Sequence, residues 1–224
     1  DAATNALMAI RPELQIFVGV AGSRKQDIPI GSVVVANLVY SPYSGKYGEK
    51  GFSARPREFP ADSRLLDVAR KTRRDKRWTD RITDLADRKL PPFDDYPCGF
   101  PPLAEIAPAV STEAVSADKA SELESLIAIH YGDACIVEME GFGSLFAASR
   151  ERTPAIVIRG VSDMAEHKEP ETDKVRQPIA AAHAAAFAFE LIARWTEFYP
   201  GAPAIPTHRT GSGLDFLRPS EPQP

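Results

Sequence analysis

Acidic side chains follow two short apolar segments of this chain, where they are placed to do chemistry. Glu138-Met139-Glu140-Gly141 comes directly after ACIV (134–137), and Ser162-Asp163 ends the run AIVIRGVSD (155–163). In open α/β sheets, ligands bind outside the carboxyl ends of the strands, and carboxylates there can meet a ligand. Two carboxylates facing one ligand can transfer a proton and hold hydroxyl groups. These segments are therefore our candidates for a functional site.

Each acidic segment also has a purely structural interpretation. Ser-Asp is a frequent helix or turn cap, so Asp163 could serve only as a cap. Glu138 and Glu140 could form the charged first turn of a helix, where the helix dipole favours acidic side chains. Residue types alone leave both interpretations open for each position.

The surrounding sequence alternates between strand-like and helix-like segments. Short apolar, β-branched runs predict buried strands at 14–22, 32–40, 103–111, 134–137 and 155–162. Helices are expected at 2–10, 61–87, 117–131, from 138 onward and at 179–199, with Pro178 in the first turn of the last one and 41–60 as a long loop. Such alternation predicts an α/β fold with three layers and a mostly parallel or mixed central sheet. The alanines of the last helix would let it approach that sheet closely.

Length and composition predict one domain. The 224 residues are 43% hydrophobic, which is enough for one sizeable core, so we expect a domain over 1–199 and a proline-rich tail or linker over 200–224. A net charge of -4 does not favour nucleic-acid binding. The basic stretch 70–81 contains Asp75 and Asp80, which is typical of a solvated helix face, although it could also contact the phosphates of a nucleotide.

The remaining composition argues against several other classes. No run of 18 apolar residues is present, so no membrane span is expected. Cys98 and Cys135 are interpreted as reduced thiols of a cytoplasmic protein. The four histidines share no spacing with one another or with cysteines, so we predict no metal and no cofactor.

Several motifs together resemble the nucleoside phosphorylase superfamily. The pattern is VEMEG (137–141), then a helix, IRGVSDMA (158–165), and a helix of the AAAHAAAFAFEL type (180–191). Within the superfamily the chain looks most like the branch of methylthioadenosine/S-adenosylhomocysteine nucleosidases and their relatives fused to sensor domains. FVGVAG (17–22), IGSVVVA (30–36) and SADKASELESL (116–126) extend the resemblance over about residues 1–197.

The resemblance implies cleavage of the N-ribosidic bond of a purine, with two catalytic carboxylates. Glu140 would grip the ribose hydroxyls while Met139 packs against the sugar. Asp163, oriented by Ser162, would donate a proton to N7 of the leaving base, like the acid of a glycosidase. The implied ligand-binding residues are Glu138, Met139, Ser162, Gly19, Val20, Ala21 and Gly22, the glycines letting the backbone approach the ligand.

Two departures from the family pattern bear on the reaction and on the base. Family phosphorylases hold phosphate with an Arg and a Ser at the positions of Phe17 and Val20 here, so water is the expected nucleophile. Related nucleosidases stack an aromatic residue on the purine where this chain has Val115, so base contact there would be apolar. We expect hydrolysis of an adenine nucleoside or nucleotide to free base and ribosyl product; methylthioadenosine, adenosylhomocysteine, adenosine, AMP and ATP all remain candidate substrates.

The resemblance also places the family's first strand, its first glycine loop and the water-activating glutamate before the position of Asp1. We therefore expect a sheet that lacks its N-terminal strands, with that segment lying upstream, supplied by another chain, or lost in a degenerate copy. The family further implies a homodimer, and the tail after Pro200 suggests a fused sensor domain. A phosphorolytic enzyme, or a non-catalytic nucleoside-binding or oligomerisation module of a larger sensor or defence protein, are the alternative functions.

Overall fold

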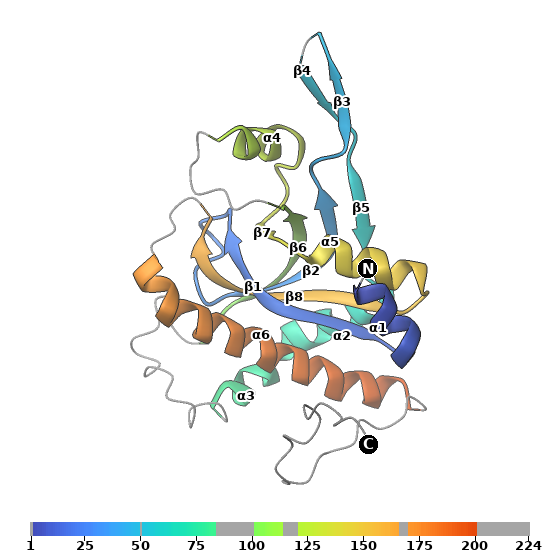
Figure 1. Cartoon of the computed structure of the whole chain (residues 1–224). Helices are drawn as coiled ribbons and strands as arrows, with labels where there is room; N and C mark the ends of the chain where they lie inside the picture. Colours follow the sequence, from blue (N-terminus) through green and yellow to red (C-terminus); the bar gives the residue numbers. More distant parts are fainter. Residues whose placement is uncertain (1, 50, 84–100, 114–120, 166–169, 201–224) are drawn as a thin grey trace, which may run out of the picture.

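The computed structural model describes residues 2–49, 51–83, 101–113, 121–165 and 170–200, arranged as helices around one strongly curved sheet (Figure 1). The helices are α1 (Ala2–Ile10), α2 (Ser63–Asp75), a 3-10 turn η1 (Arg77–Thr79), α3 (Asp80–Thr83), α4 (Glu122–His130), α5 (Gly141–Arg150) and α6 (Pro170–Phe198). The strands are β1 (Gln15–Ser23), β2 (Val33–Ser41), β3 (Gly45–Gly48), β4 (Gly51–Ala54), β5 (Arg57–Pro60), β6 (Ala104–Ser111), β7 (Ile136–Glu138) and β8 (Ala155–Met164).

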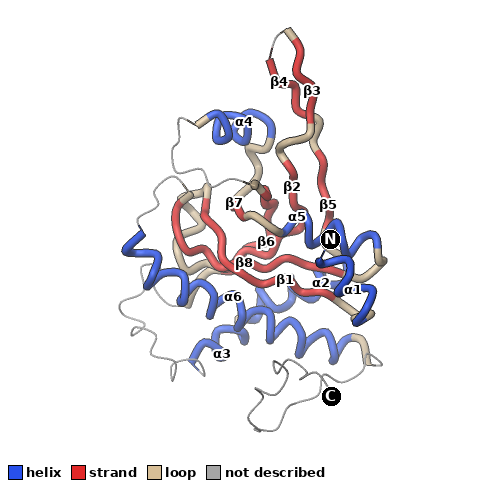
Figure 2. The backbone as a smooth tube through the Cα atoms, viewed as in Figure 1, coloured by secondary structure: helices blue, strands red, loops and turns tan. Residues whose placement is uncertain are grey.

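Five strands of the main sheet pair in a closed ring. The order is β5-β2-β6-β7-β1-β8, and β8 also pairs with β2. The pairs β1–β8, β2–β6 and β6–β7 are parallel, whereas β1–β7, β2–β8 and β2–β5 are antiparallel. Figure 2 shows the strands in red, with β5 continuing upward beside β2. The predicted mixed central sheet of an α/β fold is therefore confirmed.

Both faces of the sheet are covered, which explains the apolar runs that predicted it. Along β2, Val33 and Val35 face the core beneath α2 and α6, while Val34 and Ala36 face the core beneath α1 and α5. All four side chains are fully buried. A strand with helices on both sides must be apolar at every position rather than at alternate ones. The sheet and the helices on its two faces form the three layers of the fold.

The segment 41–60 is not the long loop that its glycines and prolines predicted. It contains β3 and β4, which form a two-stranded hairpin projecting from the body, and β5, which extends the main sheet beside β2 (Figure 1). The glycine at Gly45 makes room for a ring, because a Cβ there would lie 2.3 Å from the Phe52 ring. The conformation of 41–60 depends on cross-strand packing and on pairing with β2, and these non-local contacts cannot be read from the segment's own residues.

Three predicted helices have different bounds in the structure. The helix predicted over 61–87 ends at Asp75, because Lys76 takes a left-handed conformation (φ 59°) that starts a tighter turn. Helix α6 begins two turns before Pro178, so that proline lies inside the helix rather than at its start. Helix α4, expected within 117–131, runs from Glu122 to His130, with Ile127 fully buried. The tail 201–224 lies outside the described residues.

None of the helices in the described residues combines the length and the apolar character that crossing a membrane would require.

Candidate functional site

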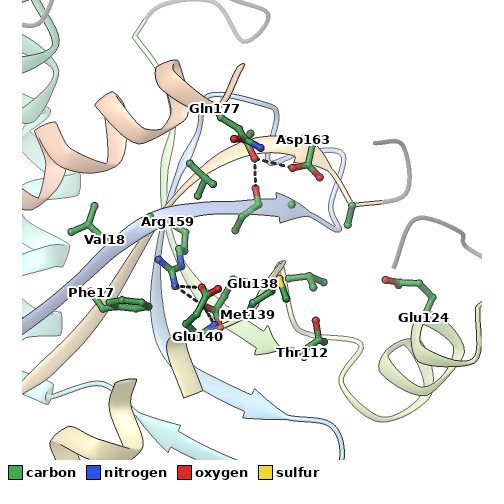
Figure 3. A pocket seen from close by; sticks show the side chains of 17 residues that line it. Phe17, Val18, Thr112, Glu124, Glu138, Met139, Glu140, Arg159, Asp163 and Gln177 are labelled. Carbon is green, nitrogen blue, oxygen red and sulfur yellow. Dashed lines mark hydrogen bonds and ion pairs between the residues drawn. The ribbon is translucent and has the colours of Figure 1, made fainter. Parts of the chain in front are cut away.

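A cavity of about 340 Å³ lies alongside β1 and brings the two acidic segments together (Figure 3). This volume is in the range of small-molecule sites. The lining consists of residues 17–22 of β1, 137–140 around the end of β7, Arg159, Ser162 and Asp163 of β8, and Thr112, Glu124, Ala165 and Gln177.

The cavity exists because β1 and β7 pair over only two residues. Gly22 lies opposite Val137 and Ser23 opposite Ile136, after which the chain leaves β7 and begins α5. The rest of β1 faces the opening that this short pairing leaves. Because β7 runs antiparallel to β1 and β8, Glu138–Glu140 turn back toward the amino half of β1, whereas Asp163 lies at the far end of β8. The acidic segments thus face one cavity from different ends, not from one row of parallel strand ends as the sequence argument assumed.

A β-bulge in β8 turns Asp163 toward the cavity. The register passes from Ala21 opposite Val161 to Gly22 opposite Asp163, so Ser162 is the extra residue. Ser162 Oγ then donates to Asp163 Oδ2 at 2.8 Å. Both side chains are almost fully buried, and Asp163 lies within a strand. The alternative in which Asp163 only caps a helix is therefore not what the structure shows.

The Glu138 carboxylate is bound by neighbouring groups of the chain. Its Oε2 accepts hydrogen bonds from the backbone N–H groups of Glu140 (3.1 Å) and Gly141 (2.7 Å) and from Arg159 Nη2 (2.6 Å). These contacts fix the turn into α5, and the structural interpretation of a carboxylate at a helix start fits this residue. Glu138 still lines the cavity, but its main contacts orient its neighbours.

Arg159 is a site residue that the sequence analysis missed. It is 2% exposed, and its guanidinium group lies against Glu138 and 3.5 Å from Glu140 Oε2 (Figure 3). It reaches them by crossing β1 at Gly19, where a Cβ would lie 2.2 Å from Arg159 Nη1. The guanidinium group also stacks on the Phe17 ring at 4.4 Å. An arginine inside the apolar run AIVIRGV was the available signal, because a buried charge needs a partner.

The glycines of 17–22 have a structural purpose that the sequence did not reveal. Gly19 makes room for Arg159, and a Cβ on Gly22 would lie 2.8 Å from Asp163 Oδ1. Val20 and Ala21, between them, also line the cavity. The two glycines therefore let the Arg159 guanidinium group and the Asp163 carboxylate pack closely against the backbone of β1.

Glu140 and Met139 reach into open space. The Glu140 side chain is 65% exposed, and Met139 is 43% exposed. Glu140 occupies the N-cap position of α5, but its side chain makes no capping hydrogen bond. Both residues also line an adjoining cavity of about 500 Å³, as do Phe17 and Thr112. A ligand held at Glu140 can therefore extend into this second space.

Four buried polar atoms without hydrogen-bond partners among the described residues belong to side chains that line the first cavity. They are Glu124 Oε1, Glu138 Oε1, Arg159 Nε and Asp163 Oδ1. Such atoms are rare in native proteins and are costly to bury. Their position beside one cavity makes this cavity a candidate site for a polar ligand.

The structure brings most of the sequence-predicted site residues together around this cavity. Val115 lies outside the described residues, so the apolar base contact stays a prediction. Besides Arg159, the sequence analysis missed Thr112, Glu124 and Gln177, which come from other elements and carry no local motif. Among the described residues, no group of three or more His, Cys, Asp or Glu side chains could hold a metal ion.

Comparison with protein families gives a match to the phosphorylase superfamily over residues 1–193. Among characterised proteins, an ATP nucleosidase of Escherichia coli (strain KTE188) is 25% identical over 187 residues, which is 80% of this chain and 36% of the relative. An uncharacterised protein of Sinorhizobium fredii is 26% identical over 171 residues, 73% of this chain and 39% of the relative. The chain thus spans little more than a third of the length of these relatives.

Solved structures of the same shape include two nucleoside-cleaving enzymes. The 5'-methylthioadenosine/S-adenosylhomocysteine nucleosidase of Neisseria meningitidis superposes with a TM-score of 0.65 at 20% identity, covering 86% of this chain and 74% of that one. The futalosine hydrolase of Helicobacter pylori gives a TM-score of 0.63 at 18% identity, covering 86% and 73%. At these identities the likeness establishes the fold.

Proposed function

Because this chain belongs to the phosphorylase superfamily, we propose that its cavity hydrolyses the N-ribosidic bond of an adenine nucleoside or nucleotide, releasing free base and ribosyl product. The observation that carries the proposal is that Glu140 and Asp163, from separate elements, line the same cavity. An acid at the base and a carboxylate at the sugar are the groups that this reaction needs.

Asp163 is the proposed acid. Its Oδ2 accepts from Ser162 Oγ, which leaves the buried and unpartnered Oδ1 to hold a proton toward N7 of the base. As that proton moves to N7, the bond between the ribose C1' and N9 of the base breaks and its electron pair leaves with the purine. The oxygen of a water molecule bonds to C1' and gives up a proton to the surrounding water, which leaves a hydroxyl on the ribose. Protonation makes the purine a better leaving group.

Glu140 is the proposed ribose ligand. Its exposed carboxylate can accept hydrogen bonds from the sugar hydroxyls, and Met139 beside it offers an apolar surface to the ribose. Hydrogen bonds to an ionised carboxylate are strong, and they support the sugar as positive charge develops at C1'. Arg159 limits where the Glu140 carboxylate can lie.

Water is the proposed nucleophile, because the sugar end of the cavity is a poor phosphate site. Phe17 and Val20 offer phosphate neither charge nor hydroxyl. Arg159 is already paired with Glu138 and lies near Glu140, so two carboxylates outnumber one guanidinium group there. A phosphate dianion would meet this negative charge in a partly buried site.

Adenine as the base is supported by what related proteins are named for. The Escherichia coli relative is an ATP nucleosidase, and the Neisseria meningitidis structure is a methylthioadenosine nucleosidase. The 500 Å³ cavity next to Glu140 has room for a substituent on the ribose. We also infer a homodimer, attachment to a sensor domain and a cytoplasmic location, as the family resemblance and the free thiol of Cys135 suggest.

The test measures free adenine released from adenosine, methylthioadenosine and ATP by the full-length protein. Asp163→Asn should slow release by roughly 10²- to 10⁴-fold, as expected for loss of a general acid. The control is Asp67→Asn, an exposed change on α2. Equal rates for Asp163→Asn and the unaltered protein would remove Asp163 from the mechanism.

The same assay distinguishes the two alternative functions. Turnover that requires added phosphate and yields ribose 1-phosphate would establish a phosphorylase instead. Binding of adenine without any release of base from its nucleosides would indicate a binding module.

A further inference from the structure

Glu124 is a buried carboxylate at the cavity that the proposed reaction does not use. It belongs to the first turn of α4, is 7% exposed and lines the same cavity as Asp163. Its Oε2 accepts from Arg24 Nη2 at 3.2 Å, whereas Oε1 has no hydrogen-bond partner among the described residues. A half-satisfied buried carboxylate beside a cavity needs a further donor.

Glu124 lies at the end of the cavity where the base would be held. Its partner Arg24 follows the last residue of β1, and Gly22, two residues earlier, lies opposite Asp163. The Arg24 backbone N–H is fixed by the Cys135 carbonyl at 2.8 Å. Figure 3 shows Glu124 on the far side of the cavity from Phe17 and Glu140, which line the sugar end. Glu124 is therefore remote from the ribose clamp.

Helix α4 does not require the Glu124 carboxylate as an N-terminal cap. The N-terminus of α4 is capped by Ser121, whose Oγ accepts from the backbone N–H of Glu124 itself. Arg24 satisfies one carboxylate oxygen only, and its Nη1 makes a long contact of 3.4 Å with the Ala134 carbonyl. The terminal torsion of a glutamate is broad, so a small rotation can turn the remaining oxygen toward a ligand.

We propose that Glu124 is a specificity residue that accepts a hydrogen bond from the exocyclic amino group of an adenine base, with Arg24 as its positioning residue. The inference rests on the proposed function, because it takes the base to lie at the Asp163 end. A carboxylate without a proton only accepts, so it favours a ring substituent that donates an N–H. A purine without that amino group leaves Glu124 unsatisfied.

The test compares two probes that differ only in this group. Dissociation constants of adenine and of unsubstituted purine are measured by calorimetry on the full-length protein, with and without Glu124→Met. The change should weaken adenine binding roughly 10- to 100-fold, as for loss of a hydrogen bond to a charged group, and leave purine binding within about threefold. The matched control is Glu122→Gln, which changes an exposed acid two residues before Glu124 on the same turn of α4.

A second variant guards against misfolding, because Glu124→Met leaves Arg24 buried without its partner. The double change Arg24→Met with Glu124→Met removes both charges and should show the same selective loss of adenine. Equal loss of adenine and purine, or no preference for adenine in the unaltered protein, would overturn the proposal.

The two proposals can fail separately. If adenosine is hydrolysed but adenine selectivity does not depend on Glu124, this inference alone is wrong. If selectivity depends on Glu124 but no nucleoside is cleaved, the cavity recognises adenine and the proposed hydrolysis is wrong.

Discussion

Arg159 sets the electrostatics of the sugar end of the cavity. It is a buried cation that is paired through Nη2 with one glutamate, Glu138, while a second, Glu140, lies 3.5 Å away with an exposed side chain. Removing one member of a buried pair leaves an uncompensated charge, which is far more costly than losing an exposed carboxylate. The two glutamates of VEMEG should therefore respond differently to substitution.

Changing Glu140 to Gln should impair catalysis without harming the fold. If Glu140 supports the sugar as charge develops, kcat/KM for the nucleoside should fall by about 10²-fold, while free adenine binds as before. The side chain is mostly exposed, so the thermal unfolding midpoint should not change. Steady-state kinetics and adenine calorimetry on the full-length protein check this, and a loss of adenine affinity equal to the loss of kcat/KM would refute the assignment to the sugar.

At the residue scale, the sequence predicted the acidic side chains of the site but not what surrounds them. Glu138, Glu140 and Asp163 lie at or just after the ends of strands in short motifs, so a local pattern identifies them. Arg159 had one local signal, a charge inside an apolar run, but its place at the cavity follows from the pairing of β1 with β8. Glu124 reaches the cavity through the placement of α4, which leaves no local pattern.

At the scale of elements, α6 approaches β8 closely enough to require a glycine. A Cβ on Gly160 would lie 1.9 Å from the Ala180 carbonyl oxygen, which is backbone and cannot move aside. The alanines of α6 predicted this close approach. The apolar runs also predicted the strands of the main sheet, because burial on both faces leaves a continuous hydrophobic signal. The β3–β4 hairpin was missed, because Gly45, which makes room for the Phe52 ring, looks like a loop glycine in the sequence.

Gly160→Ala should therefore destabilise the protein. The clash forces α6 from the sheet, and we expect a loss of about 3 kcal/mol in the free energy of unfolding, the upper range for overpacking. Urea unfolding followed by circular dichroism measures it. Gly143→Ala is the matched control: the residue is exposed in α5 with nothing within 4 Å of a new Cβ, so stability should stay equal or rise by about 1 kcal/mol. Similar unfolding midpoints for both variants would contradict the close packing of α6.

At the scale of the whole molecule, one buried histidine links stability to pH. His183 of α6 is fully buried, and its Nδ1 lies 2.6 Å from the Gly31 carbonyl before β2. Burial lowers the pKa of His183 below its ordinary 6.5, although the Gly31 carbonyl opposes part of that shift. The unfolded chain therefore binds a proton more readily than the folded protein at mildly acidic pH, and folding loses stability there.

The unfolding midpoint should thus fall as pH drops from 7.5 through 6.5 to 5.5, and fall less in His183→Gln, which keeps an N–H near Gly31. Each kcal/mol lost lowers the midpoint by about 2–4 °C in a chain of this size. Scanning calorimetry of both proteins across this range makes the comparison. Parallel pH profiles for the two would show that His183 does not contribute.

The closed ring of strands also has a consequence for biosynthesis. Its last member, β8, pairs with both β1 and β2, so contacts join residues more than 100 positions apart. Such long-range pairing makes folding slow. On the ribosome, β1, β2, β6 and β7 must emerge and wait with unpaired edges until residues 155–164 have left the exit tunnel. A nascent chain arrested before that point should recruit chaperones, and one released after it should not.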